Sequence, residues 1–307
     1  MDLKAGTKAN KLAIKHYWQE MKHTPLTTAL SMFLPAIGSI FVSYAPPLVV
    51  AKILARFKQQ GALELNQFLP YVIIFCVLWL IGEAFWRTGI WFACKQSYLT
   101  MKRLYANALG YLLEKDLRFF HENFAGSLTK KALNYARRYD DFFNNLMFNV
   151  MPNIIPLFFI GYVLWRYSFW LVIILIALLF LTFWTVVPLI KRRQKLVNLR
   201  EDASSVVAGY LADVITNADA VKAFASEDFE EKEHVKLTED YATKSRRSWD
   251  YHNLKIDMVT SPFYVLTNAL GLLVAVLISK HTTASIEVVF ITFSYYALAT
   301  RMVWDFN

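Results

Sequence analysis

The segment "VVAGYLADVITNADAVKAFASEDFEEKEHVKL", residues 206–237, interrupts a chain that is otherwise rich in apolar blocks. Its centre, "NADAVKAFASEDFE" (217–230), is short, polar and charged, and a long helical pattern flanks it on each side. One pattern runs back to Phe169 and the other runs forward to Ser279. Because a helix rises about 1.5 Å per residue, these lengths predict two long helices joined by a tight turn at about Asp213–Ser226.

A second hairpin of the same kind is predicted earlier in the chain. One helical pattern runs from Gln67 to Leu117 and another from Leu128 to Trp165, with a turn at about Phe119–Ser127. Crossing about 30 Å of hydrocarbon takes about 20 residues, so the four patterns should extend roughly 25–50 Å beyond the bilayer. Prolines within the patterns are expected to kink these helices: Pro152, Pro156, Pro188 and Pro262.

Composition indicates a membrane protein. Of the 307 residues, 56% are hydrophobic, whereas soluble domains average about 45–50%. The apolar blocks predict an all-α membrane protein with six transmembrane helices and long cytoplasmic extensions. The blocks are Leu26–Val50, Phe68–Ala93, Leu146–Pro188 (two spans separated at Trp165–Ser168), Met258–Ser279 and Glu287–Asn307.

The distribution of positive charge predicts the topology. Lys and Arg concentrate in residues 1–25, 95–145 and 191–257, which the positive-inside rule places in the cytoplasm. We therefore expect an integral, multi-pass protein of the cytoplasmic (inner) membrane, and we attribute the net charge of +9 to topology and not to nucleic acid.

Two regions follow from this pattern: residues 1–25, and a transmembrane domain at 26–307 with cytoplasmic hairpins at about 95–145 and 190–257. In the first region, apolar residues recur at helical spacing among lysines, which is typical of a helix lying on the membrane surface. We call this predicted element the elbow helix. A solvated tail with chance periodicity is the alternative.

No catalytic or metal-binding pattern stands out. Cys76 and Cys94 lie 18 residues apart on one predicted helix, so they cannot bridge within a chain. The six histidines show no metal-ligand spacing, and no phosphate loop of the G-x-x-x-x-G-K-[ST] type occurs. The sequence therefore predicts no catalytic, cofactor-binding or metal-binding residues in this chain.

Charged residues inside the predicted spans suggest a substrate cavity. Glu83 and Arg87 lie four residues apart on the second span, and Arg301 and Asp305 repeat this spacing on the sixth. Intramembrane charge is costly unless it faces water or a partner, which favours a polar cavity wall in the inner leaflet. Alternatively, each pair merely neutralises itself, or the side chains of Arg87 and Asp305 extend to the membrane interface. The predicted wall also includes four aromatic residues: Trp79, Trp86, Tyr295 and Tyr296.

These segments resemble a known family. Residues 206–237 resemble the second intracellular loop of ATP-binding cassette (ABC) exporters, with Val221-Lys222-Ala223-Phe224 as the hydrophobic–Lys–aromatic element and Glu227–Glu230 as the acidic run. Residues 116–143 resemble the first intracellular loop of the same family, with Phe119-Phe120 as the double aromatic, Gly126 as the turn glycine, and Asp140-Asp141 as the acidic residues that follow. It departs from the pattern at Lys130-Lys131 and Asn134, where an Arg and an Asp are commoner.

The resemblance spans essentially the whole chain and implies the transmembrane half of an ABC exporter of the type I (type IV) fold. Each hairpin turn would be a coupling helix against an ATPase domain that binds ATP and magnesium. The other implied partners are the lipid bilayer and a second transporter half, as a homodimer or heterodimer. The resemblance assigns coupling to Phe120, Glu122, Gly126, Asp213, Asn217, Asp219, Val221, Lys222 and Phe224, with Asn217, Asp219 and Glu227 able to cap and orient the second turn.

The implied function is ATP-driven export of an amphipathic lipid, peptide or drug-like molecule by alternating access. We expect the ATPase domain to follow Asn307 or to lie on another chain, and we favour a fragment of a longer polypeptide. The alternatives are a secondary transporter or channel not driven by ATP, or a membrane scaffold whose helices bind another cytoplasmic protein. A proton-driven carrier would use several carboxylates deep in the membrane, but only Glu83 lies clearly inside a span.

Overall fold

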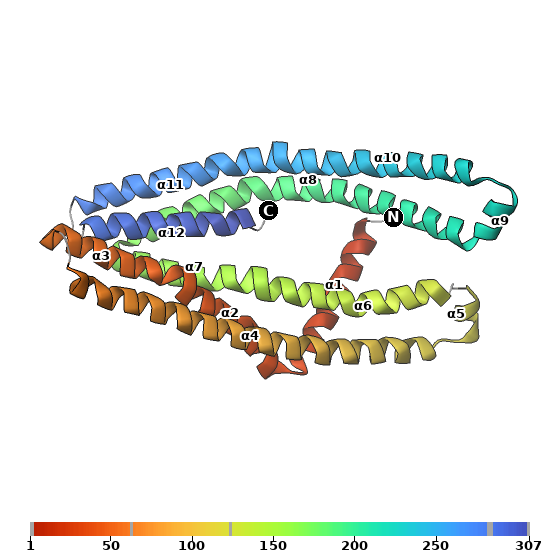
Figure 1. Cartoon of the computed structure of the whole chain (residues 1–307), viewed down its shortest axis with the longest axis horizontal. Coiled ribbons are helices and arrows are strands. Elements are labelled where there is room, and N and C mark those ends of the chain that lie inside the picture. The colour runs from red at the N-terminus through yellow and green to blue at the C-terminus, as the bar shows by residue number, and fades with distance from the viewer. Residues whose placement is uncertain (1–2, 62–63, 123–124, 281–284, 306–307) are drawn as a thin grey trace. The chain divides into compact units, whose positions relative to one another are not determined.

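The structure, a computed structural model, describes residues 3–61, 64–122, 125–280 and 285–305 (Figure 1). Within these ranges the secondary structure is helical, with no strand. The elements, with π-helical turns labelled η, are α1 (Leu3–Lys22), α2 (Pro25–Ser39), η1 (Ile40–Tyr44), α3 (Pro46–Gln60), α4 (Leu65–Leu113), α5 (Leu117–Glu122), α6 (Ala125–Asn145), η2 (Leu146–Val150), α7 (Met151–Tyr167), α8 (Phe169–Thr216), α9 (Ala218–Ala223), α10 (Glu227–Tyr251), η3 (His252–Asp257), α11 (Met258–Ser279) and α12 (Ser285–Asp305).

The long helices of the two predicted hairpins are confirmed. α4 contains 49 residues and α8 contains 48, so each is about 70 Å long. The helix from Glu227 to Ser279 runs for 53 residues through α10, η3 and α11. Both hairpin turns contain a six-residue helix, α5 in the first and α9 in the second.

Five stretches of the described residues are long and apolar enough to cross a membrane: Pro25–Gln60, Leu65–Leu113, Lys131–Tyr167, Phe169–Thr216 and Glu227–Ser279. The helix ends between the third and fourth stretches at Ser168, where the backbone is extended, as the polar break in the apolar block predicts. α12 is not among the five stretches. The all-α membrane fold is thus confirmed, while the count of six spans stays a prediction.

Two prolines of the apolar helices, Pro46 and Pro152, each follow a π-helical turn, η1 and η2 respectively, with one residue between. The N–H of Ala45 donates to Ile40 O at 2.7 Å, immediately before Pro46. In the same way, the N–H of Met151 donates to Leu146 O immediately before Pro152. Proline lacks an N–H and crowds the carbonyl four residues earlier, and the wider π-turn accommodates that local change. α8 continues as α-helix through Pro188.

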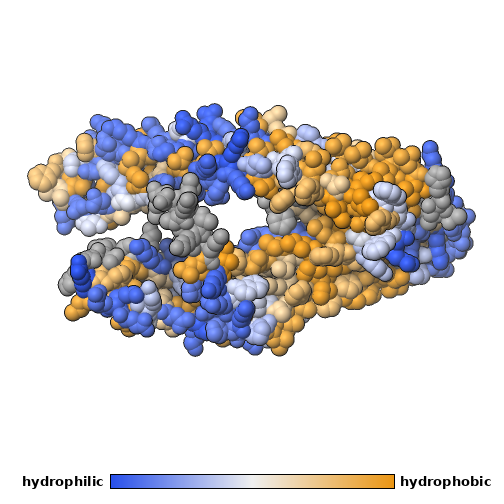
Figure 2. All heavy atoms as spheres, turned by 180° about the vertical axis from the view of Figure 1, so that it is seen from behind, coloured by the Kyte–Doolittle hydropathy of each residue, from blue (hydrophilic) through white to orange (hydrophobic). Residues whose placement is uncertain are grey.

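The described chain divides into two compact units. Unit 1 comprises Met1–Phe169 with Ala275–Tyr295, and unit 2 comprises Trp170–Val274 with Tyr296–Asn307. Unit 1 contains the hairpin α4–α5–α6, and unit 2 contains the hairpin α8–α9–α10. Away from the hairpin turns, Figure 2 shows a broad hydrophobic surface over the helices, as expected for the portion in contact with lipid.

Glycines allow α2 and α4 of unit 1 to approach closely. A Cβ atom on Gly82 would lie 2.9 Å from the Gly38 carbonyl oxygen and 3.0 Å from the Phe41 Cβ. A Cβ atom on Gly89 would lie 2.5 Å from the Pro35 ring. Lipid tails provide no hydrophobic driving force between helices, so close backbone packing of this kind is a main source of helix association in membranes.

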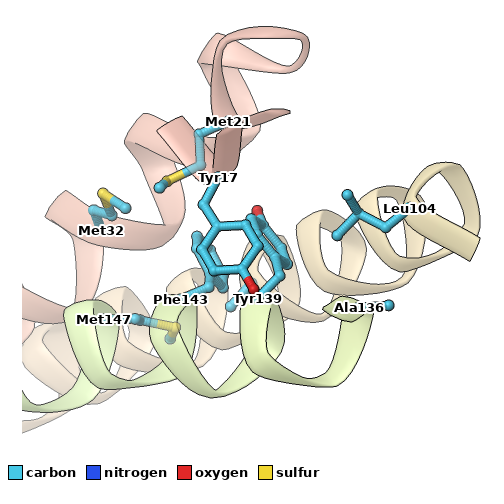
Figure 3. Close-up of a cluster of buried hydrophobic side chains, with 9 residues drawn as sticks. Tyr17, Met21, Met32, Leu104, Ala136, Tyr139, Phe143 and Met147 are labelled. Atoms are coloured by element: carbon cyan, nitrogen blue, oxygen red, sulfur yellow. The ribbon is translucent and has the colours of Figure 1, made fainter. Parts of the chain in front are cut away.

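Helix α1 packs against the first hairpin through aromatic side chains (Figure 3). The ring of Tyr17 lies 5.5 Å from Tyr139 and 5.6 Å from Tyr135, measured between centroids. Tyr17 of α1 and Tyr139 and Phe143 of α6 belong to one buried cluster, to which α2 and α4 also contribute. These contacts attach the predicted elbow helix to the hairpin at its described residues.

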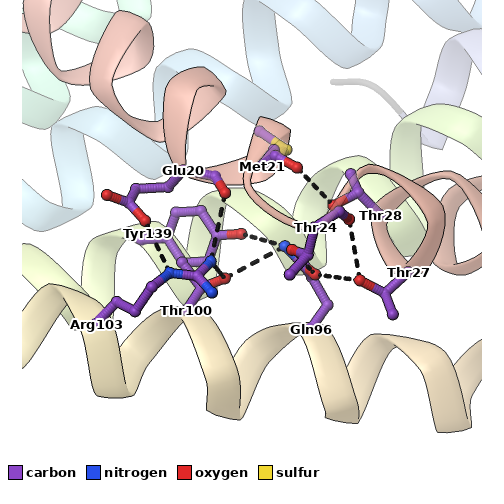
Figure 4. A network of polar contacts seen from close by, with 9 residues as sticks. All are labelled: Glu20, Met21, Thr24, Thr27, Thr28, Gln96, Thr100, Arg103 and Tyr139. Atoms are coloured by element: carbon purple, nitrogen blue, oxygen red, sulfur yellow. Dashed lines mark hydrogen bonds and ion pairs between the residues drawn. The ribbon is translucent and has the colours of Figure 1, made fainter.

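A polar network next to this cluster joins the same elements (Figure 4). Gln96, fully buried on α4, accepts hydrogen bonds from Thr24 at 2.6 Å and Thr27 at 2.7 Å. Arg103 pairs with Glu20 of α1, with 3.3 Å between Nε and Oε2. The buried polar groups therefore have partners on neighbouring elements, which fixes the position of α1 along α4.

Candidate coupling and substrate sites

The turn of the second hairpin is a compact, exposed helical tip. Asn217 stands at the N-cap position of α9, but it makes no side-chain capping hydrogen bond. Its Nδ2 instead donates to Asp213 O at 3.0 Å and to Asp213 Oδ1 at 3.2 Å. The expected cap is thus replaced by a second hydrogen bond to the Asp213 carbonyl, which also accepts from the backbone N–H of Asn217. Asp219 lies in the first turn of α9, where a negative charge is favourable.

The end of α9 has the hydrogen-bond pattern of a Schellman motif. Ser226 N donates to Val221 O at 3.0 Å, and Ala225 N donates to Lys222 O at 3.3 Å. The motif requires a left-handed backbone at the residue just after the C-cap, and Ala225 occupies that position with φ of 47°. Such a conformation costs a non-glycine residue roughly 1–2 kcal/mol. The other hydrogen bonds of the tip must therefore hold this turn in place.

Ala225→Gly is expected to stabilise the tip by about 1 kcal/mol, because glycine adopts the left-handed conformation without a Cβ clash. Amide hydrogen exchange at Ser226, followed by mass spectrometry, should slow by a few fold. Ala223→Gly, at the last residue of α9, is the matched control and should speed exchange. Faster exchange in Ala225→Gly would contradict a strained turn.

Charged and aromatic side chains surround the tip. Lys222 pairs with Glu227 at 2.9 Å, and this hydrogen bond holds the pKa of the Glu227 carboxyl below its usual value. Tyr210 of α8 donates to Glu230 of α10, which raises the pKa of Tyr210 to about 12. Tyr210 thus stays protonated at neutral pH and links the two helices behind the tip. Phe224 is 81% exposed.

The turn of the first hairpin is also capped from within the chain. Asp116 accepts a hydrogen bond from Phe119 N at 3.0 Å, at the start of α5. Phe119 and Phe120 form an edge-to-face pair with 5.6 Å between centroids, and Phe120 is exposed. Asp116 was not among the predicted site residues, although an Asp three residues before the double aromatic is a capping signal. The Glu122 side chain and the surroundings of Gly126 lie outside the described residues.

The predicted substrate residues fall into two groups. On α4, Glu83 Oε1 and Arg87 Nε pair at 2.6 Å, and both side chains are well exposed within this chain. Trp79 is exposed on the same helix, and Trp86 packs against Phe148. Arg301 is exposed on α12, whereas the side chain of Asp305 lies outside the described residues. These residues have surface available for a substrate or a partner.

Tyr295 and Tyr296 form the second group, and burial gives them a packing role. Both are fully buried. In unit 1, Tyr295 donates to Tyr44 O at 2.7 Å, and in unit 2, Tyr296 donates to Leu171 O at 2.7 Å against Gly271. Their hydroxyls are engaged with backbone carbonyls, so we leave both residues out of the proposed cavity. Periodicity alone does not show which face of a helix packs inward.

Known proteins provide an independent comparison. The family model described as "ABC transporter transmembrane region" matches residues 29–303. The chain is 22% identical over 256 residues to ABC transporter B family member 24, mitochondrial, of Arabidopsis thaliana, covering 78% of this chain and 37% of that protein. It also matches a solved structure of a bacterial Atm1-family ABC exporter with ATP bound, with a TM-score of 0.69 and 18% identity.

That structural match covers 93% of this chain and 50% of the solved chain, so this sequence spans about half the length of the exporter it matches, and less of the plant relative. At 18% identity the structural match supports the fold alone. The family match covers most of the chain and agrees with the helical membrane fold and its two long hairpins. The chain therefore belongs to the ABC transporter transmembrane region family, with the fold of an ABC exporter.

Proposed function

We propose that this chain is the membrane-spanning half of an ATP-driven exporter, with the α5 and α9 turns as the sites where cytoplasmic ATPase domains bind. The observation that carries this proposal is the geometry of the second hairpin. A 48-residue α8 and a 53-residue helix from Glu227 to Ser279 meet at one short, exposed tip. Helices of this length are stiff over tens of ångströms, so a displacement at the tip reaches the membrane-spanning part.

In this proposal the ATPase domains approach each other on binding ATP and move the two tips. The long helices then change the access of a membrane cavity from the cytoplasmic side to the opposite side. The tip is suited to this task because its own bonds hold it: the Schellman turn at Ala225, the Lys222–Glu227 pair and the Tyr210–Glu230 bond. A preorganised surface loses less entropy on binding.

ATP and magnesium belong to the partner domain in this scheme. The described residues contain no group of three His, Cys, Asp or Glu side chains placed to hold a metal ion. The 307-residue sequence contains no phosphate loop. This chain's proposed contribution is to receive motion and to form half of the transport pathway beside a second half, either identical or homologous.

Cysteine cross-linking tests the proposal. In a transporter with Cys76 and Cys94 replaced by serine, a cysteine at Ala218 should cross-link to an ATPase domain. We further propose that the fourth and fifth spans cross over to the opposite half, so the cross-linked product should contain the ATPase domain of that half. A cysteine at Glu239, exposed farther along α10, is the control and should give no product. Cross-linking only to the same half would exclude the crossover, and no cross-link at Ala218 would contradict the coupling role.

The substrate proposed is an amphipathic lipid, peptide or drug-like molecule, in contact with Trp79, Glu83, Trp86, Arg87 and Arg301. The exposed Glu83–Arg87 pair combines charge with neighbouring aromatic surface. Charge at this depth is favourable beside water or a polar ligand.

Arg301→Ala is expected to change substrate-stimulated ATPase activity several-fold while leaving basal activity and expression close to wild type. The physical reason is that Arg301 is exposed, so its removal leaves no buried cavity. ATPase titrations with candidate amphiphiles measure the effect. Arg246→Ala, an exposed arginine on α10, is the control. Joint loss of folding and basal turnover in Arg301→Ala would show a structural role instead.

A further inference from the structure

We propose that a cavity between α1 and the first hairpin binds a small amphiphilic anion, with an apolar body and one acidic head group. The cavity has a volume of about 660 Å³ and lies wholly within unit 1. Ligand sites are typically of roughly 300–1,000 Å³, mostly apolar, with a few polar groups that orient the ligand. The lining here has that composition.

The walls come from four elements. Leu104, Ala108 and Leu112 of α4 face Leu128 and Ala132 of α6, and these residues form the apolar sides. The two alanines leave room that larger residues would fill. Phe119 of α5 lines the cavity next to the hairpin turn. His16 and Glu20 line it from α1, beside Tyr135.

The position of α1 is fixed by direct hydrogen bonds to the first hairpin. Tyr17 Oη donates to Tyr135 O at 3.1 Å, and Arg103 bonds to both the side chain and the carbonyl of Glu20 (Figure 4). The buried aromatic cluster of Figure 3 adjoins the same region. α1 therefore forms part of the cavity wall and is held there by specific bonds.

The charged residues of the lining indicate that the ligand is negatively charged. Glu20 is already neutralised by Arg103, and its side chain is only 14% exposed. Lys131 is exposed and has no ion pair with another residue of the described chain. The cavity thus has one ammonium group available beside an apolar surface, which suits an anion attached to a hydrocarbon or aromatic body. A solvated lysine over an unfilled groove is the competing explanation.

Ligand binding at this site would have a structural consequence. A molecule in the cavity would contact both α1 and Phe119 of α5, and it would favour whichever arrangement of the first hairpin keeps the cavity open. Only this consequence for coupling rests on the proposed function, because binding itself depends on unit 1 alone.

The experiment uses the complete transporter in phosphatidylcholine nanodiscs. One probe is a diazirine-bearing hexadecanoate, and the second is the uncharged alcohol with the same chain and diazirine. After irradiation, mass spectrometry measures labelling of residues 104–112 and 128–135 relative to the apolar part of α8. The alcohol distinguishes apolar occupancy from recognition of the anion.

We expect the carboxylate to label both segments more strongly than the α8 reference. Lys131→Met should lower this labelling about tenfold without changing the alcohol's labelling. Lys102→Met, an exposed lysine on α4, should have no effect. Ala108→Trp should abolish labelling by both probes because it fills the cavity.

Several results would overturn the proposal: equal carboxylate labelling in Lys131→Met, retained labelling in a folded Ala108→Trp, or wild-type labelling no stronger than the α8 reference. Thermal unfolding verifies that each variant is folded, and Lys131→Met keeps the test decisive if Ala108→Trp does not fold. ATPase activity is measured in the same samples. Binding without any effect on ATPase activity would contradict only the consequence for coupling, and a wild type without ATPase activity would contradict the proposed function.

Discussion

Phe224→Asp should reduce substrate-stimulated ATP turnover and transport by about thirtyfold, with basal hydrolysis and membrane insertion retained. Phe224 is 81% exposed at the end of α9, so the isolated chain gains little from it. A large aromatic residue exposed at the tip is typical of an interface anchor, whose loss costs about 2 kcal/mol or more of binding free energy. A buried carboxylate in its place would add a desolvation cost.

Tyr241→Asp is the matched control, because it makes the same change of an exposed aromatic residue on α10. It lies 14 residues beyond Glu227, about 20 Å from the start of that helix. We expect normal stimulation in this variant. Assays compare stimulated and basal ATPase rates with transport into vesicles for the wild type and both variants. Full stimulation in Phe224→Asp, or an equal loss in Tyr241→Asp, would remove Phe224 from the coupling surface.

The extent of the long helices was predictable from the sequence because it depends on local chemistry. The stretch from Glu227 to Ser279 has an uninterrupted helical pattern, and the structure has one continuous helix with the same ends. The break at Ser168 was equally predictable, since a polar interruption within an apolar block favours a turn. The effect of the prolines was less predictable from the sequence. The π-turns before Pro46 and Pro152 depend on how each helix rearranges its backbone hydrogen bonds.

The candidate sites were less predictable because their details depend on three-dimensional packing. The burial of Tyr295 and Tyr296 depends on carbonyls of Tyr44 and Leu171, each more than 100 residues away. The left-handed backbone at Ala225 has no signal in the sequence, where glycine or asparagine would be expected. The cavity beside Lys131 likewise depends on packing, because α1 contributes His16 and Glu20 to the lining formed with the first hairpin.

Gly82→Leu should strongly destabilise the apolar part of unit 1. A Cβ atom at this position would lie 2.9 Å from the carbonyl oxygen of Gly38, which is backbone and cannot rotate away. α2 and α4 would have to separate, and overpacking of this kind costs about 3 kcal/mol or more. We expect a large loss of monodisperse protein after detergent extraction and a clear fall in the thermal unfolding temperature, measured by tryptophan fluorescence.

Gly110→Leu on the same helix and Gly161→Leu on α7 are the controls, because a Cβ atom at either position meets nothing within 4 Å. Leucine favours the helix more than glycine does, so both controls should be at least as stable as the wild type. Equal destabilisation in all three variants would show that the loss comes from added bulk in general and not from the close approach of α2 and α4.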